Sequence, residues 1–310
     1  MSGRVAVFGG GAMGGVWAAR MAASGIDVTV VDPAEAVISA VTADGLRVER
    51  DGEELVVHPT VVPEPSGIEP VDVAFVFVKA YHTESVARSL PAVLGPSAIT
   101  VSLQNGWGNA DVLARYVDPS KLAIGVTYHS AMVVSAGHIR HTAQGATFVG
   151  PYGSDVGVAE RAAAPMRAGG IEVTVSPTIR TEVWRKLILN AATLPTSALT
   201  RLAAGRLAEQ GPTLDLVDGL ATEAVAVAVA QGLDIDLAER IARIHAVLSG
   251  GGSGRSSMLQ DVLASRRTEI SVVNGAVVRV AHELGLDVPL NRAVVALIDG
   301  LERSWQAAEA

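Results

Sequence analysis

A lysine and an asparagine four residues apart lie in the segment Trp184-Arg185-Lys186-Leu187-Ile188-Leu189-Asn190. This spacing places Lys186 and Asn190 on one face of a helix whose other faces are apolar. A lysine held among apolar groups has a lowered pKa and can transfer a proton near neutral pH, which arginine cannot do. The same pattern also fits a solvated lysine beside a buried helix face.

Two further polar groups occur later in the chain. Ser256-Ser257 follows a glycine-rich loop, where hydroxyls can cap a helix or hold a carboxylate beside its N-terminal amides. Thr268 is typical of an N-cap, which predicts that Glu269 lies in the first turn of a helix and stays ionised there. Glu269 could equally be no more than part of that cap.

A glycine motif near the start of the chain predicts a dinucleotide site. The apolar run Val5–Phe8 ends in Gly9-x-Gly11-x-x-Gly14, with Ala12 and Met13 between the last two glycines and a helical pattern following. Such glycines allow a tight turn, a close approach to pyrophosphate and close packing of helix on strand. Asp32 closes the next strand, where a carboxylate accepts ribose hydroxyls and repels a 2′-phosphate, so NAD(H) is favoured over NADP(H). A plain glycine turn and an adenosine-binding methyltransferase are the alternatives.

Polar residues also follow later strands of the same region. Lys79 and Asn105 lie where two predicted strands end, which is the edge that borders the ligand crevice of an open sheet. Lys79 can reach cofactor hydroxyls or phosphate, and the Asn105 amide can donate and accept. Asn105-Gly106 also fits a simple turn. His129, after the fifth strand, fits a structural histidine better than a catalytic one.

The predicted secondary structure that positions these residues changes near Pro177 from alternating strands and helices to helices. Before it, strands and helices alternate, which predicts a mostly parallel, doubly wound sheet of Rossmann type. After it the pattern is almost wholly helical, so we expect an α/β domain over 1–177 followed by an all-α domain over 178–310. The predicted strands are Val5–Phe8, Val28–Val31, Val73–Val78, Ile99–Leu103 and Leu122–Tyr128, with a hairpin in 46–62 turning at Asp51-Gly52 and a second pair, His138–His141 with Ala146–Val149. The predicted helices are Glu182–Asn190, Leu214–Gln231, Leu237–Leu248, Glu269–Leu284 and Asn291–Ala308.

Composition excludes several classes of function. The formal net charge is −8 with no block of like charges, so we expect neither a nucleic acid nor a membrane partner. The chain has no cysteine, which excludes disulfides and thiolate chemistry, and its 7 histidines form no metal-spaced pair on a helix, so no metal site is expected. The absence of a leader-like segment at the N-terminus and of an apolar run long enough to span a bilayer favours a cytoplasmic protein.

Taken together, the motifs resemble those of the ketopantoate reductase (2-dehydropantoate 2-reductase) family. The similar segments are Gly9–Gly14, Val78–Ala80, Asn105–Gly108, Glu182–Leu187, Ser256–Asp261 and Thr268–Ile270, so the likeness runs through the whole chain. The resemblance implies a nicotinamide-dependent reduction of a small 2-oxo acid to a 2-hydroxy acid by a homodimer. Lys186 would be the general acid, and Asn105 would contact both the nicotinamide ribose and the substrate. Ser257 would bind the substrate carboxylate, Asn190 a hydroxyl, Glu269 the ribose or substrate, and the Ala131 backbone the cofactor.

Three positions depart from the family pattern. Leu194 stands where a second asparagine is usual, Gly254 replaces a polar residue, and Asp32 is unexpected because the family typically uses NADP. A substrate hydroxyl left without its partner costs roughly 1–3 kcal/mol, so a more apolar, branched 2-oxo acid would fit better. The alternatives are a D-2-hydroxy acid dehydrogenase for branched or aromatic acids and a dinucleotide-sensing protein without catalysis.

Overall fold

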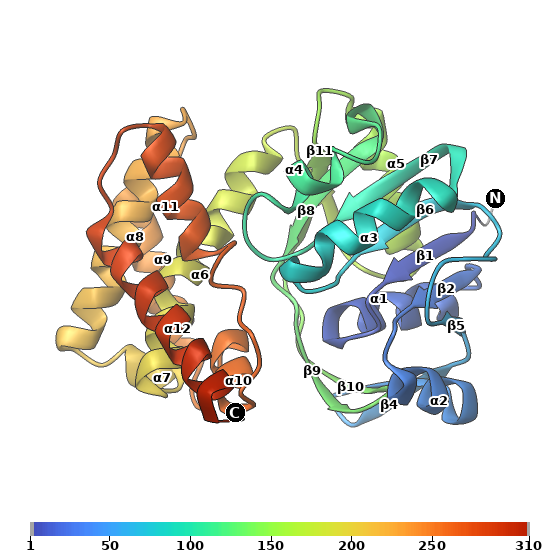
Figure 1. Cartoon of the computed structure of the whole chain (residues 1–310), viewed down its shortest axis with the longest axis horizontal. Helices are drawn as coiled ribbons and strands as arrows, with labels where there is room; N and C mark the ends of the chain where they lie inside the picture. The colour runs from blue at the N-terminus through green and yellow to red at the C-terminus, as the bar shows by residue number, and fades with distance from the viewer. Residues whose placement is uncertain (1–2, 309–310) are drawn as a thin grey trace. The chain divides into compact units, whose positions relative to one another are not determined.

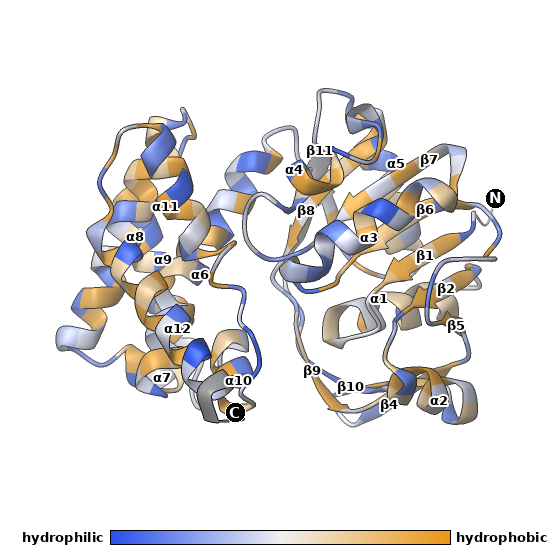
Figure 2. Ribbon diagram, in the orientation of Figure 1, coloured by the Kyte–Doolittle hydropathy of each residue, from blue (hydrophilic) through white to orange (hydrophobic). Residues whose placement is uncertain are grey.

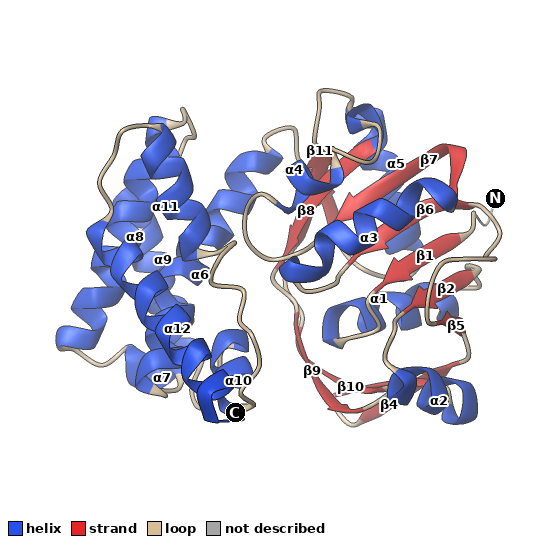
Figure 3. Cartoon of the chain, in the orientation of Figure 1, coloured by secondary structure: helices blue, strands red, loops and turns tan. Residues whose placement is uncertain are grey.

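The structure, a computed structural model, describes residues 3–308. The chain divides into two compact units, one made of strands and helices and the other of helices alone (Figures 1 and 3). The first, here called the sheet unit, runs to Ile179 but omits Asn105–Gly108. Those four residues group with the chain from Arg180 onward, here called the helical unit.

An eight-stranded, mostly parallel sheet forms the centre of the sheet unit, in the order β12-β11-β8-β7-β6-β1-β2-β5. β1 pairs in parallel with β2 and β6, while β11 runs antiparallel to β8. The strands are β1 (Val5–Phe8), β2 (Val28–Val31), β5 (Thr60–Val62), β6 (Val71–Val76), β7 (Leu94–Ser102), β8 (Leu122–Thr127), β11 (Thr147–Pro151) and β12 (Val173–Val175). This sheet, with helices alone in the chain that follows it, confirms the predicted fold class.

Helices cover both faces of this sheet because its central strands are apolar on both sides. In β1, Val5 and Val7 join the core under α1 and α5, whereas Ala6 and Phe8 join the opposite core under α3 and α4. Figure 2 shows the hydrophobic character of β1 and β6. The helices are α1 (Ala12–Ala23), α2 (Glu35–Asp44), α3 (Thr83–Ser89), α4 (Asn109–Leu113) and α5 (Val156–Ala168), with short 3₁₀ turns at Ala80–His82, Leu90–Ala92 and Pro119–Lys121.

A separate four-stranded sheet has the order β4-β3-β10-β9. Its strands are β3 (Leu46–Arg50), β4 (Glu53–Val57), β9 (Ser130–Ser135) and β10 (His138–Ala143). The predicted hairpin is present as β3 and β4, with Asp51 and Gly52 at its turn.

The predicted pairing of His138–His141 with Ala146–Val149 is wrong. β10 pairs with β9 and β3, whereas β11 pairs with β8 and β12. The tight turn lies instead at Gly137, whose φ of +67° suits glycine. Around Gly145 the chain is held against Tyr128, whose N–H donates to the carbonyl of Ala146, so this segment carries the chain from one sheet to the other.

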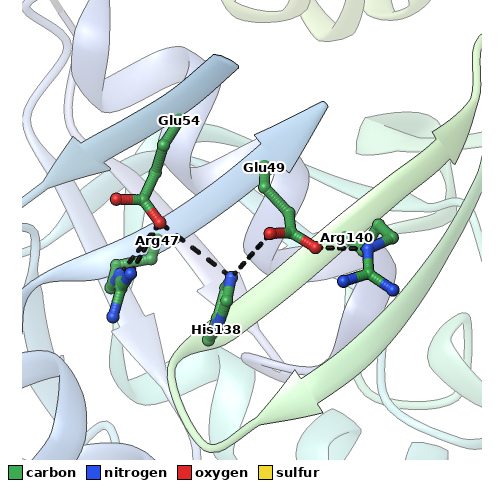
Figure 4. A network of polar contacts seen from close by, with 5 residues as sticks. All are labelled: Arg47, Glu49, Glu54, His138 and Arg140. Atoms are coloured by element: carbon green, nitrogen blue, oxygen red, sulfur yellow. Dashed lines mark hydrogen bonds and ion pairs between the residues drawn. The ribbon is translucent and has the colours of Figure 1, made fainter. Parts of the chain in front are cut away.

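Charged side chains link three strands of the smaller sheet (Figure 4). Glu49 of β3 pairs with Arg140 and lies 3.3 Å from Nε2 of His138, both on β10. Glu54 of β4 pairs with Arg47 of β3 at 2.7 Å and lies 4.0 Å from the same His138 nitrogen. These cross-strand pairs favour the observed register of β10 against β3.

The helical unit has its own core, built around α6 (Ile179–Thr200) and α8 (Pro212–Ala230). Trp184, Leu187 and Ile188 of α6 are fully buried there against residues of α8, α9 and α11. The other helices are α7 (Ala204–Leu207), α9 (Leu237–Gly250), α10 (Ser257–Leu263), α11 (Asn274–Glu283) and α12 (Pro289–Ala308). Among the described residues, no helix is long and apolar enough to cross a membrane.

The helix predicted from Glu269 begins only at Asn274, so Glu269 does not lie in its first turn. The backbone N–H and the hydroxyl of Thr268 both donate to Glu302 of α12, at 2.8 and 2.6 Å. This anchor and the β-branched residues that follow favour consecutive tight turns over Glu269–Val273. The carbonyl of Glu269 accepts from the N–H groups of Val272 and Val273 within those turns.

Candidate active site

The glycine motif forms a tight turn between β1 and α1. Gly9 has φ +100°, and a Cβ on Gly14 would lie 1.9 Å from the carbonyl oxygen of Gly9, so both positions require glycine. A Cβ on Gly11 would meet no atom within 4 Å. α1 begins at Ala12 with no side-chain cap and no acidic residue in its first turn. This open, uncapped helix start fits the pyrophosphate of a dinucleotide.

Asp32 is tied to that turn. Its Oδ2 accepts from the N–H of Gly10 at 2.7 Å, and its Oδ1 accepts from the N–H of Ala34 at 2.9 Å. Each carboxylate oxygen keeps a second lone pair, so hydroxyl groups of a ribose can still donate to it. The Asp32 carboxylate therefore lies beside the glycine turn.

Two other predicted cofactor residues belong to the same unit. Lys79 follows β6 and is partly buried, and its carbonyl accepts from the N–H of His82 in the adjoining 3₁₀ turn. Ala131 lies on β9, which contacts α1, and packs with Met13 against the core under α1. Met13 and Ala131 thus pack against the same hydrophobic core as α1, whose first residue follows the glycine turn.

Lys186 is the predicted general acid, and it lies in the helical unit. It is partly buried on α6, and its Nζ donates to Oδ1 of Asn105 at 2.9 Å. Burial lowers the pKa of Lys186 to about 8, and the negative charge of Glu269 opposes this shift. Glu269 is itself only 9% exposed. The structure therefore brings together an ammonium group, an amide oxygen and a carboxylate, and the ammonium can lose its proton near neutral pH.

The two other predicted substrate residues, Asn190 and Ser257, lie in the same unit as Asn105. Asn190 follows Lys186 by one turn of α6 and is 8% exposed. Ser257 is the first residue of α10 and is exposed, whereas its neighbour Ser256 is the cap, accepting from the N–H of Leu259 at 3.1 Å. The hydroxyl of Ser257 is therefore not used as a helix cap. No hydrogen bond among the described residues joins Ser257 to Lys186.

His129 has the structural surroundings that its sequence context favours. Its Nδ1 lies 3.0 Å from Nε2 of His141, and the edge of Trp17 packs on its ring at a centroid distance of 5.0 Å. Burial, then the neighbouring His141 and arginine charges, lower the pKa of His129 to about 4. His129 is therefore neutral at physiological pH.

The role of Trp107 was missed by sequence reasoning, which noted this residue only as part of a motif. In the structure its ring contacts the Arg180 guanidinium and the Trp184 ring, and its backbone N–H donates to the carbonyl of Val272. These partners lie far along the chain, so the only local signal was an aromatic residue between two glycines.

Comparison with known proteins identifies the same family in both halves of the chain. Residues 5–154 match a family model described as ketopantoate reductase PanE/ApbA, and residues 178–302 match the model of its C-terminal part. A curated 2-dehydropantoate 2-reductase of Archaeoglobus fulgidus is 33% identical over 303 residues, covering 96% of this chain and 98% of the relative. The protein of the same name from Halobacterium salinarum is 35% identical over 298 residues, covering 95% and 97%.

Solved structures have the same fold. A PanE/ApbA family ketopantoate reductase from Ralstonia eutropha is 32% identical with a TM-score of 0.89, covering 98% of this chain and 99% of that one. D-mandelate dehydrogenase, solved with NADH and anilino(oxo)acetate, has a TM-score of 0.93 at 23% identity and covers 97% and 99%. At that identity the second likeness supports the fold alone.

Proposed function

Because the chain belongs to the PanE/ApbA ketopantoate reductase family, we propose that it reduces 2-dehydropantoate, or a close 2-oxo acid, to the corresponding 2-hydroxy acid. The observation that carries this proposal is the Lys186 ammonium, whose pKa burial lowers to about 8 and whose proton points at the amide oxygen of Asn105. A carbonyl being reduced needs one proton on its oxygen, and an acid of this pKa can supply it near neutral pH.

The candidate polar residues of the helical unit take complementary roles in this scheme. A bound dihydronicotinamide supplies the hydride that reaches C2 of the substrate. Lys186 gives its proton to the carbonyl oxygen, which becomes the hydroxyl of the product. Asn105 orients the ammonium and contacts the ribose and the substrate. Ser257 binds the carboxylate, Asn190 binds a hydroxyl, and Glu269 helps keep Lys186 charged until hydride transfer.

The sheet unit supplies the dinucleotide site in this proposal. Gly9, Gly11 and Gly14 shape the turn, Ala12 and Met13 begin the helix whose amides face the pyrophosphate, and Lys79 and Ala131 complete the contacts.

Asp32 accepts the ribose hydroxyls, so NADH is the preferred cofactor. We expect a kcat/KM at least tenfold higher with NADH than with NADPH. In Asp32→Asn this ratio falls because the variant no longer repels a 2′-phosphate, and a parent enzyme that prefers NADPH would refute the Asp32 argument.

A second candidate substrate class is supported by the face of α6 that carries the acid. Lys186, Asn190 and Leu194 follow one another at intervals of four residues, so the polar face becomes apolar one turn beyond Asn190. Leu194 packs against both hydrophobic clusters of the helical unit. A branched or aromatic 2-oxo acid places an apolar group there more favourably than one with a terminal hydroxyl.

A panel of 2-oxo acids separates these two substrate classes. Purified protein is assayed with NADH and with NADPH against 2-dehydropantoate, branched-chain and aromatic 2-oxo acids. The highest kcat/KM with 2-dehydropantoate supports the first candidate, and a clear preference for an aromatic or branched acid supports the second. Binding of NADH without turnover of any 2-oxo acid would leave a dinucleotide sensor as the function.

The resemblance to the family also leads us to propose a homodimer formed through the helical unit. Leu290 and Leu297 of α12 are 37% and 57% exposed, and each contributes apolar surface that a second copy could cover. Size-exclusion chromatography with light scattering measures the mass of the protein in solution. A mass near that of one 31.9 kDa chain would contradict the dimer.

A further inference from the structure

The short segment Asn105–Gly108 is held in an unusual backbone conformation. Gly106 and Gly108 have φ values of +87° and +103°, in the left-handed region that favours glycine, and they flank Trp107 on both sides. A Cβ on Gly106 would lie 2.4 Å from the carbonyl oxygen of Val272. The segment is therefore pressed directly onto the backbone of the turn at Val272.

Trp107 fastens this segment to the helical unit through its backbone and its ring. Its N–H donates to the carbonyl of Val272 at 2.8 Å, and its own carbonyl accepts from the guanidinium of Arg279 at 3.3 Å. The Arg180 guanidinium carbon lies 5.2 Å from the ring centroid, within cation–π range. The Trp184 ring packs at 5.9 Å with an interplanar angle of 53°.

The turn at Val272 positions two groups that act on Lys186, the carboxylate of Glu269 and the side-chain oxygen of Asn105. The N–H of Val272 donates to the carbonyl of Glu269 at 3.1 Å, so Val272 and Glu269 belong to one hydrogen-bonded turn. Glu269 stabilises the charged form of Lys186 from that turn. Asn105, two residues before Trp107, accepts from Lys186 at 2.9 Å. Any displacement of Trp107 from Val272 moves the Asn105 oxygen relative to the ammonium.

We propose that Trp107 is a positioning residue for the acid. It acts by holding the Asn105 oxygen on the Lys186 ammonium. A hydrogen bond to the charged form raises the pKa of a lysine, so this contact limits how far burial lowers the pKa of Lys186. The part played by Lys186 in turnover rests on the proposed reduction, whereas the effect of Trp107 on the Lys186 pKa does not.

The pKa of Lys186 can be measured without any activity because the chain contains only three lysines, Lys79, Lys121 and Lys186. Competitive acetylation across a pH series, read by mass spectrometry of the lysine peptides, follows each amine separately. Lys121 has a side chain that is 43% exposed and serves as the internal reference. We expect Trp107→Ala to lower the pKa of Lys186 in the same direction as Asn105→Ala, and Trp107→Phe to keep it near the parent value.

The double variant tests whether Trp107 acts through Asn105. If so, Trp107→Ala combined with Asn105→Ala lowers the pKa no further than Asn105→Ala alone. An unchanged Lys186 pKa in Trp107→Ala, or a double variant in which the two shifts add, overturns the proposal. Trp305→Ala is the matched control, because Trp305 packs against a different hydrophobic cluster and its loss leaves the Lys186 pKa unchanged.

Gly106→Ala provides a second route to the same displacement and retains every aromatic side chain. Its Cβ forces the segment away from Val272, so we expect a lowered Lys186 pKa in Gly106→Ala as well.

Once a substrate that the parent enzyme reduces has been identified, Trp107→Ala is expected to reduce kcat at least tenfold, with a smaller change in KM. Trp107→Phe is expected to recover the parent kcat. Absence of turnover in the parent would contradict the proposed reduction, while the acetylation result would still decide the role of Trp107.

Discussion

At the scale of single residues, the proposed chemistry depends on a lysine whose burial is energetically unfavourable. Removing an ammonium group from water disfavours its charge, which is why the pKa of Lys186 falls to about 8 despite the attraction of Glu269. The side-chain oxygen of Asn105 accepts a hydrogen bond from this ammonium at 2.9 Å. The combination gives an acid that is mostly protonated at pH 7 and that gives up its proton readily.

Replacing Lys186 by alanine removes that acid. We expect kcat for reduction to fall about 10²–10⁴-fold, the usual contribution of a positioned general acid. In the parent protein, kcat for reduction declines as pH rises through about 8, whereas oxidation of the hydroxy acid accelerates over the same range, because reduction needs the charged form and oxidation the neutral form. Stopped-flow measurements of NADH absorbance follow both directions. Lys121→Ala is the control, and near-normal turnover in Lys186→Ala would remove Lys186 from the mechanism.

Replacing Lys186 by methionine tests the energetic cost of its burial. Because the pKa is lowered on folding, the unfolded chain binds more protons than the folded chain between about pH 8 and 10.5, so this site favours unfolding at pH 7 and ceases to do so as pH rises. We expect Lys186→Met to raise the free energy of unfolding at pH 7 by about 1–3 kcal/mol while abolishing turnover. Urea unfolding at pH 7 and pH 10 measures this gain. A gain that is equal at the two pH values would contradict a cost due to charge.

At the scale of elements, the turn from β1 to α1 contains one glycine that the fold requires, Gly14, and one that faces open space, Gly11. A Cβ at Gly14 would collide with the carbonyl of Gly9, while one at Gly11 would meet nothing within 4 Å. The two glycines therefore have different physical reasons for being glycine, although the sequence motif treats them alike.

The paired variants Gly14→Ala and Gly11→Ala distinguish these reasons. We expect Gly14→Ala to lower stability by about 1–3 kcal/mol or more, since backbone must shift to admit the methyl group. Gly11→Ala keeps parental stability and weakens NADH binding at least tenfold, because its methyl group occupies the approach of the pyrophosphate. Thermal unfolding and fluorescence titration with NADH provide the two measurements. Equal losses of stability in both variants would contradict the distinction.

The type of each helix or strand was predictable where the sequence signal was local. Strand pairing and one helix start were predicted wrongly because residues distant in the sequence determine them. The apolar strands of the larger sheet and the hairpin at Asp51-Gly52 follow from short patterns and short connections. The partner of β10 depended on Tyr128 holding the chain near Gly145, which no local pattern reveals. The helix predicted at Glu269 begins later because Glu302, 34 residues after Thr268, anchors that threonine.

The candidate site was predictable in part for the same reason. Lys186 and Asn190 could be placed on one helix face from their spacing alone. A strand end, a glycine-rich loop and an expected helix start singled out Asn105, Ser257 and Glu269, and the family resemblance then gave these residues their roles. The hydrogen bond between Asn105 and Lys186 spans 81 positions in the sequence, and the fastening of Trp107 to Val272 depends on tertiary contacts that no motif describes.

At the scale of the whole molecule, each unit has a hydrophobic core of its own, built from different secondary structure. Strand residues such as Val7 and Phe75 dominate the sheet unit, and helix residues such as Trp184 and Leu220 dominate the helical unit. Separate cores allow each unit to hold its own candidate residues in place, the glycine turn in the sheet unit and Lys186 in the helical unit.

The four residues Asn105–Gly108 restrict how such proteins can be recombined. A chimera joined once, near Ile179, would take these residues from the parent of the first segment and their docking turn at Val272 from the other parent. Successful exchange between homologues therefore needs three crossovers, so that this short insert is inherited together with the helices that receive it.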